Sequence, residues 1–151
     1  MSERTKRSIL PLFDRLASEL PAPDSGMLDT MEALEESIGR ELHRMFNTRS
    51  NLGLAAYLRA EGTVLDYGLP NFSFLSGQSA TDLESLQKAL EVAIRRFEPR
   101  LLDPSVRVSP SRDKNGMGVV QVTASARLGS EIRRIEFELA HEIASGVRNT
   151  Q

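Results

Sequence analysis

Residues 79–102, SATDLESLQKALEVAIRRFEPRLL, combine an amphipathic helical pattern with a proline that ends it. The apolar residues recur at spacings of three and four, which places them on one face of a helix. They are Leu83, Leu86, Leu90, Ile94, Phe97 and Leu101. Thr81 and Glu84 have the spacing of a capping box, which predicts the start of the helix. Because Pro99 lacks a backbone N–H and disfavours helical geometry at Glu98, the helix is expected to end there.

The segment Glu98-Pro99-Arg100-Leu101 is therefore predicted to be a rigid corner with one acidic and one basic side chain. Two interpretations remain open for these charges. They either pair with each other and cap the helix, or both point towards a partner protein.

The last third of the chain changes to a period of two, which is typical of half-buried antiparallel strands. Apolar residues alternate with polar ones in three runs, Val106 and Val108, then Val120, Val122, Ala124 and Ala126, then Ile135, Phe137 and Leu139. Turns are expected at residues 114–116 and 128–130. The predicted fold class is α+β, with helices packed on one face of a small antiparallel sheet of three or slightly more strands.

The third predicted strand has no later strand to pair with, so it is expected to be a sheet edge. The unpaired backbone groups of an edge strand can accept a strand from a partner, although most edges have no such role.

A second amphipathic helix is expected from about Leu28 to Phe46. Its apolar stripe consists of Met31, Leu34, Ile38, Leu42, Met45 and Phe46, and its predicted solvent face of Glu32, Glu35, Glu36, Arg40 and Glu41. Residues 1–25 are expected to form a flexible N-terminal arm with a short amphipathic helix, and residues 26–151 a single domain. That short helix either docks on its own domain or seeks a partner, and the sequence leaves both open.

Composition excludes several classes of protein. The chain has 151 residues and a net charge of −2, which argues against general nucleic-acid binding. It has no cysteine, so disulfides and thiolate metal sites are excluded. No apolar run approaches the roughly 20 residues that cross a bilayer, and a cytoplasmic location is expected.

No catalytic, metal-binding or cofactor-binding signature is apparent. His43 and His141 lack metal-ligand spacing, and no phosphate-binding glycine motif occurs. Glu35 and Glu36 diverge by about 100° on a helix, so they do not form the facing pair that glycoside hydrolysis needs. The arginine pairs at 95–96 and 133–134 are predicted to lie on solvated faces. We therefore expect no catalytic residue, no metal, no cofactor and no small-molecule substrate.

Four short segments, in this order, resemble motifs of one family. They are Ser8-Ile9-Leu10 with Phe13-Asp14-Arg15-Leu16, then Leu42 with Phe46-Asn47-Thr48-Arg49, then Tyr67-Gly68-Leu69-Pro70-Asn71, then Phe97-Glu98-Pro99-Arg100-Leu101. The family is that of the baseplate wedge proteins of contractile injection machines, which includes the TssE component of type VI secretion systems and phage relatives that carry a lysozyme name. Met45-Phe46 stands where two leucines are commoner, and Asn71 where aspartate is common.

The resemblance implies a non-catalytic structural component that joins the baseplate wedge to the first sheath ring and templates sheath assembly, with strand addition as the expected mode. It implies that Glu98, Pro99, Arg100 and Leu101 form a protein-binding contact. The implied partners are other wedge subunits and sheath proteins, with no nucleic acid. The membrane is implied only indirectly, through a baseplate docked at the cytoplasmic face of the inner membrane.

Two alternatives from other classes remain. One is a lysozyme-like hydrolase of cell-wall glycan, which would need facing carboxylates and a route out of the cytoplasm. The other is a small regulatory adaptor that reuses the same fold for a different partner.

Overall fold

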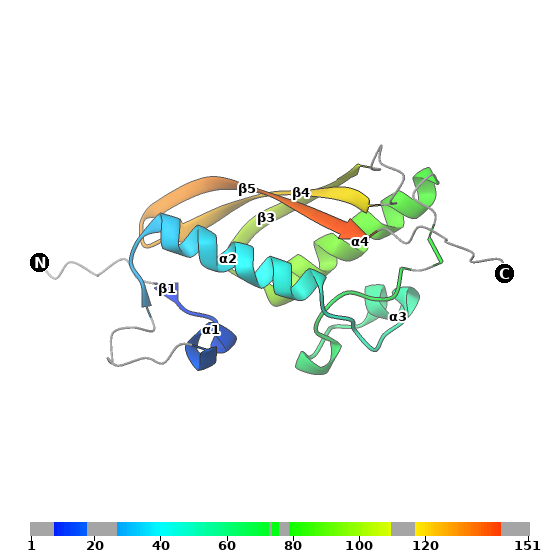
Figure 1. The fold of residues 1–151 in the computed structure, drawn as a ribbon, viewed down its shortest axis with the longest axis horizontal. Coiled ribbons are helices and arrows are strands. Elements are labelled where there is room, and N and C mark those ends of the chain that lie inside the picture. Colours follow the sequence, from blue (N-terminus) through cyan, green and yellow to red (C-terminus); the bar gives the residue numbers. More distant parts are fainter. Residues whose placement is uncertain (1–7, 18–26, 73, 76–78, 110–116, 143–151) are drawn as a thin grey trace, which may run out of the picture.

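The fold consists of a three-stranded antiparallel sheet with two long helices on one of its faces (Figure 1). The computed structural model describes residues 8–17, 27–72, 74–75, 79–109 and 117–142. The strands β3 (Leu101–Ser109), β4 (Met117–Leu128) and β5 (Glu131–Glu142) lie in the order β3-β4-β5. The helices are α2 (Met31–Phe46) and α4 (Ala80–Phe97). The predicted α+β class and the three-stranded meander are confirmed.

Smaller elements lie on the far side of the two long helices from the sheet (Figure 1). They are the paired strands β1 (Ser8–Ile9) and β2 (Met27–Leu28), the helices α1 (Leu12–Ala17) and α3 (Leu54–Arg59), and the 3-10 turn η1 (Val64–Asp66). The flexibility expected for the arm falls mostly on residues 1–7 and 18–26, which lie outside the described residues. The expected turn at 114–116 also lies outside them.

The two long helices begin where a hydroxyl caps a free backbone N–H. Thr30 Oγ1 accepts from the Ala33 N–H at 3.1 Å, so α2 begins about three residues later than expected. Ser79 Oγ accepts from the Asp82 N–H at 3.3 Å. The expected capping box of Thr81 and Glu84 was therefore wrong, because Ser79 is extended and caps α4 two residues earlier.

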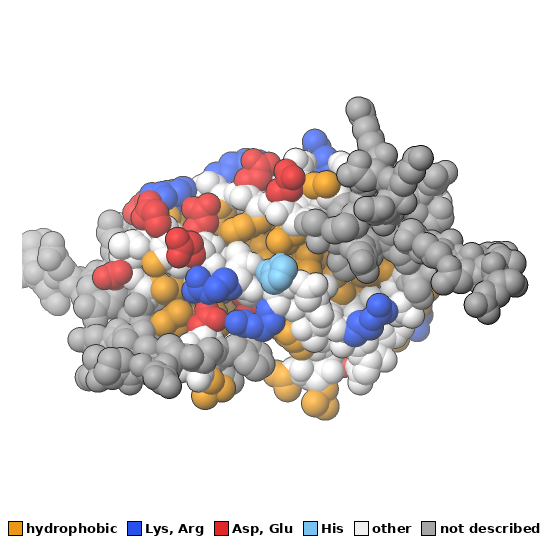
Figure 2. All heavy atoms as spheres, in the orientation of Figure 1, with side chains coloured by type: hydrophobic (Ala, Val, Ile, Leu, Met, Phe, Trp, Pro, Cys, Tyr) orange, Lys and Arg blue, Asp and Glu red, His pale blue; other side chains and the backbone are white. Residues whose placement is uncertain are grey.

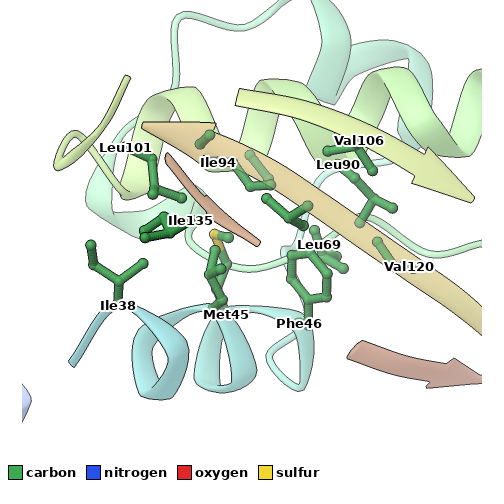
Figure 3. Packing of buried hydrophobic residues seen from close by; sticks show 14 of the residues in the cluster. Ile38, Met45, Phe46, Leu69, Leu90, Ile94, Leu101, Val106, Val120 and Ile135 are labelled. Atoms are coloured by element: carbon green, nitrogen blue, oxygen red, sulfur yellow. The ribbon is translucent and has the colours of Figure 1, made fainter. Parts of the chain in front are cut away.

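The core lies between the helices and the inner face of the sheet, as Figure 3 shows. The whole predicted stripe of α2 is buried, and β4 buries every second residue from Val120 to Leu128. Residues from all layers meet there, including Ile38 and Met45 of α2, Leu90 and Ile94 of α4, and Leu101, Val106, Val120 and Ile135 of the sheet. Burying each such side chain contributes about 1.5–3 kcal/mol, which makes this contact the main source of stability.

One apolar side chain is unexpectedly exposed, and one expectation about the solvent face of α2 was wrong. Phe72 and Leu75 are buried, but Phe74 between them is 64% exposed. Glu41 was placed on the solvent face of α2, yet it is buried at 7% exposure, because Tyr67 and Arg44 both bind its carboxylate.

The loop at residues 67–71 lies against the end of α2, where it leaves no room for a side chain at Gly68. The Leu69 N–H donates to Thr48 O at 2.9 Å, and the Ser50 N–H donates to Leu69 O at 2.8 Å. Gly68 has φ of +102°, and a Cβ there would lie 2.4 Å from Thr48 O. Only glycine satisfies both conditions.

We expect Gly68→Ala to lower the free energy of unfolding by about 2 kcal/mol or more, since it adds strain and a clash with backbone. Gly53→Ala is the matched control, because Gly53 has φ of −70° and a Cβ added there would meet no atom within 4 Å. It is expected to stay within about 1 kcal/mol of wild type. Chemical denaturation measures both, and equal effects of the two variants would contradict this account of the loop.

Candidate functional site

The predicted corner at Glu98–Leu101 is a tight turn that joins α4 to β3. The Glu98 N–H donates to Ile94 O at 2.9 Å and ends the helix. The Leu101 N–H donates back to Glu98 O at 3.1 Å and closes the turn, and Leu101 is the first residue of β3. Pro99 is exposed at the tip, whereas the Glu98 side chain is 1% exposed.

Glu98 and Arg100 pair with each other, which decides between the two interpretations of their charges. Arg100 Nε donates to Glu98 Oε1 at 2.7 Å, and Arg100 Nη2 donates to Oε2 at 2.5 Å. The Arg100 backbone N–H also donates to Oε1 at 3.2 Å. This two-pronged geometry matches the planar guanidinium to the planar carboxylate and satisfies a charge that is almost fully removed from water.

The remaining Nη1 group of Arg100 connects the corner to α2 and to α1. It donates to Ser37 Oγ at 2.9 Å, and Ser37 is fully buried. The Ser37 hydroxyl in turn donates to Asp14 Oδ2 of α1 at 3.5 Å. Because Ser37 has only one proton to give, its orientation fixes the direction of this chain from Arg100 to Asp14.

Asp14 lies among two further arginines of α2. Arg44 Nη2 donates to Asp14 Oδ1 at 3.0 Å, and Arg40 Nη2 donates to Oδ2 at 3.5 Å. Burial opposes the charge of Arg44, but Asp14 and Glu41 outweigh it and raise the pKa of Arg44. In the space-filling view, basic side chains gather over α2 on the side that faces α1, with acidic side chains beside them (Figure 2).

Glu41 carries the network on to the loop at residues 67–71 and back to α4. Arg44 Nη1 donates to Glu41 Oε2, and the Tyr67 hydroxyl donates to Glu41 Oε1 at 2.6 Å. The Tyr67 ring meets the Phe97 ring edge-on, with ring centroids 5.3 Å apart. Burial first, and then the Glu41 carboxylate, raise the pKa of Tyr67 well above its ordinary value.

Three of the four sequence motifs therefore meet around this corner, and the other is linked to one of them. Asp14 comes from the first motif, Tyr67 from the third, and Phe97 with the ion pair from the fourth. The second motif closes the set, because Arg49 Nη1 donates to Asn71 Oδ1 of the third at 2.9 Å. We call the group of Asp14, Ser37, Arg40, Glu41, Arg44, Tyr67, Glu98 and Arg100 the corner network.

Sequence reasoning found Glu98 and Arg100 but missed Ser37 and Glu41. A serine inside an apolar helical stripe, at i−1 from Ile38, was the available signal for Ser37. Glu41 gave no signal, because its position on the helix suits a solvated residue equally well. Both residues acquire their role from segments distant in the sequence.

Arg96 was predicted to lie on a solvated face, and this was wrong. Its Nη1 donates to Tyr57 O at 2.8 Å and its Nη2 donates to Ala60 O, so it binds carbonyl groups at the end of α3. Its guanidinium also lies over the Tyr57 ring, 5.1 Å from the centroid. Burial raises the pKa of Tyr57 to about 12, with Arg96 opposing the shift.

The described residues contain no group of three or more His, Cys, Asp or Glu side chains that could hold a metal ion. Glu35 and Glu36 are successive residues of α2, as expected, and do not face each other. No described helix is long and apolar enough to cross a membrane. The hydrogen bonds and ion pairs of the corner network hold its side chains and segments in fixed positions.

A known protein family matches the sequence. The family described as baseplate wedge protein gp25 matches residues 32–132. Because this match covers more than half of the chain, the chain belongs to the gp25 family of baseplate wedge proteins. No curated protein matches the sequence significantly. The gp25 family is the one that the four motifs predicted, and its name is that of a component of the baseplate wedge.

One solved structure supports the fold. One chain of "The baseplate complex from the type VI secretion system" superposes with a TM-score of 0.53 at 16% identity, over 73% of this chain and 95% of that one. A putative tail lysozyme from Geobacter sulfurreducens gives a TM-score of 0.46 at 21% identity, over 72% of this chain and 91% of that one.

We expect Glu98→Gln to lower the free energy of unfolding by about 2–4 kcal/mol, because it leaves the Arg100 charge partly buried without its carboxylate. Glu32→Gln is the matched control. Glu32 accepts from Arg133 at 2.8 Å, but the side chains are 70% and 41% exposed, so the loss of this pair should change the free energy of unfolding much less. Urea denaturation compares the two, and a Glu98→Gln cost no larger than that of the control would contradict the role given to the pair.

The two tyrosines give a pH test, because the chain has only Tyr57 and Tyr67 and no tryptophan. Raised pKa values mean that the folded state holds both phenolic protons more tightly than the unfolded state. Stability is then full below about pH 10 and falls as the pH rises towards and past 12. Phenolate absorbance of the folded protein should rise only above the midpoint of the urea-unfolded chain, and coincident midpoints would contradict the burial of both hydroxyls.

Proposed function

We propose that this chain is a non-catalytic structural subunit of a type VI secretion baseplate, which joins the wedge to the first sheath ring and templates sheath assembly. The family match over residues 32–132 carries this proposal. The similar fold of a chain from a type VI baseplate complex supports the choice of machine. The partners are other wedge subunits and sheath proteins, in a baseplate at the cytoplasmic face of the inner membrane.

The corner at Glu98–Leu101 is proposed as the contact with other wedge subunits. Glu98 is buried and paired, so its part is to hold the turn. The surface at the corner is formed by Pro99 and by the 17% of the Arg100 side chain that stays exposed. Leu102, 36% exposed, lies just beyond the turn and adds apolar area. A fixed turn with exposed apolar groups loses little conformational entropy on binding, which suits an assembly contact.

The sheet has two edges, and β3 is poorly suited to accept another strand. Its register with β4 is interrupted between Leu102 and Ser105. Asp103 there has φ of +48°, and Pro104 has no N–H to donate. The Val106 N–H already donates to Glu91 Oε1 of α4 at 3.3 Å. A bulge, a proline and a side-chain cover are devices that protect an edge from pairing.

The β5 edge has none of these interruptions. Its twelve residues pair with β4 in continuous register from Glu131 to Glu142, without a proline. Among the described residues no strand lies on its other side. We therefore propose that β5, as the expected edge strand, receives an extended segment of a sheath protein.

Charge adds a requirement for that segment. Glu136 and Glu138 are exposed on the outer face of β5, and Arg134 precedes them. Oppositely charged pairs across neighbouring strands are favourable and like charges are not. A strand that binds beside β5 is expected to present basic side chains near the two glutamates. The same two glutamates discourage pairing between two copies of β5.

Single-cysteine cross-linking tests both contacts, because the chain has no cysteine of its own. The variants are Glu138→Cys on β5, Arg107→Cys on β3 and Pro99→Cys at the corner. Glu138 and Arg107 make a matched pair, since both oppose Gln121 of β4 and both are exposed. In cells with a functional machine, position 138 should cross-link to a sheath protein, position 99 to a wedge subunit, and position 107 to neither.

Sheath cross-links from position 107 and not from 138 would reverse the choice of edge. An absence of wedge and sheath proteins among all products would contradict the function itself. Purified protein should also leave peptidoglycan intact, and sustained turnover would favour the hydrolase alternative.

A further inference from the structure

Asp14 occupies a basic site that the rest of the domain builds. Arg40 and Arg44 come from α2, and Arg100 reaches the site through the Ser37 hydroxyl. The Asp14 side chain is 11% exposed, whereas Arg44 is 32% and Arg40 is 51% exposed. The carboxylate is thus enclosed, but one wall of its site is open to solvent.

The charges of the corner network balance only while Asp14 is present. Three guanidinium groups, those of Arg40, Arg44 and Arg100, face three carboxylates. Two of these, Glu41 and Glu98, belong to the domain itself. The third is Asp14, so without α1 the site would hold three positive charges and two negative ones. A partly enclosed site with one positive charge in excess favours an anion.

Several features of the described part of α1 suit an exchangeable contact. The contacts of Asp14 with Ser37 and with Arg40 are long, at 3.5 Å each. Leu16 of α1 is 72% exposed, and a six-residue helix is not stable by itself. Leu10, which precedes α1, is partly buried against the core. A second carboxylate that takes the place of Asp14 would keep these arginines paired, so exchange costs less than leaving the site empty.

We propose that the site formed by Ser37, Arg40, Arg44 and Arg100 binds an acidic side chain of a neighbouring wedge subunit, and that Asp14 holds it as an exchangeable ligand beforehand. This inference rests on the proposed wedge function and specifies its chemistry. Arginine binds a carboxylate through paired hydrogen bonds, as Arg100 does with Glu98. The site shares Arg100 with the corner, so a partner seated on Pro99 has it within reach.

Two substitutions release α1 by opposite means, which makes the test decisive. Asp14→Asn removes the carboxylate and leaves the basic site intact. Arg40→Glu repels Asp14 and removes the excess positive charge, on a side chain exposed enough to leave the fold unaffected. Arg15→Gln, on the exposed side of the same helix, is the control. Amide hydrogen exchange of residues 12–17 in the full chain should speed up in both test variants and stay unchanged in the control.

Binding is then measured against the wedge subunits purified from a strain that lacks this chain. Asp14→Asn should bind about fivefold more tightly than wild type, because a competing ligand has gone. Arg40→Glu should bind more weakly than wild type, although its α1 is equally free. Arg15→Gln should match wild type.

Other outcomes overturn the proposal. Tighter binding by both test variants would mean that α1 is only a steric cover, and weaker binding by both would mean that docked α1 is itself the contact. Equal affinity in all variants would show that the site takes no part. Self-association of Asp14→Asn would identify a second copy as the occupant, and displacement of the wedge subunits by inorganic phosphate would identify a general anion site. If wild type and variants all fail to bind, the wedge function itself falls.

Discussion

Glu98 and Arg100 place two opposite charges where the chain turns from α4 into β3, inside the protein. A carboxylate with 1% exposure has to be paired, and the two-pronged contact with Arg100 pairs it within a span of three residues. The same contact sets the direction in which β3 leaves the corner. Since β3 pairs with β4, and β4 with β5, the position of the sheet against both helices follows from this turn.

The ion pair also explains why distant segments converge. Arg100 keeps one donor group after binding Glu98, and the buried Ser37 hydroxyl accepts from it. That hydroxyl leads to Asp14, and the neighbouring Arg44 leads through Glu41 to Tyr67. Because buried polar groups need hydrogen-bond partners, each residue of the network requires a neighbour that donates to it or accepts from it. The family's most recognisable motif thus stabilises the fold first, and the partner contact proposed for it falls on its exposed proline.

Much of the fold could be predicted because it follows from periodicity. The stripe of α2, the face of α4 and the alternation in β4 are each a local pattern with one apolar side, and burying that side leaves few possible arrangements. Boundaries were less certain. Ser79 and Thr81 are both good caps, and the structure uses Ser79, which starts α4 two residues earlier. Arg96 shows the same limit of sequence-based prediction, because its position on the helix does not reveal whether its guanidinium binds water or a carbonyl group of α3.

The sequence by itself determined the α+β class, the apolar faces, the corner at Pro99 and the resemblance to the wedge family, because all of these depend on residue types at short spacings. Only the tertiary structure decided that Glu98 pairs with Arg100, that Glu41 is buried, that Asp14 sits among arginines, and that β5 is the uninterrupted edge. Most of these outcomes depend on contacts between segments that lie far apart in the sequence. A side chain's charge is local, but its burial and its partner are properties of the packed chain, and so they follow only from the fold.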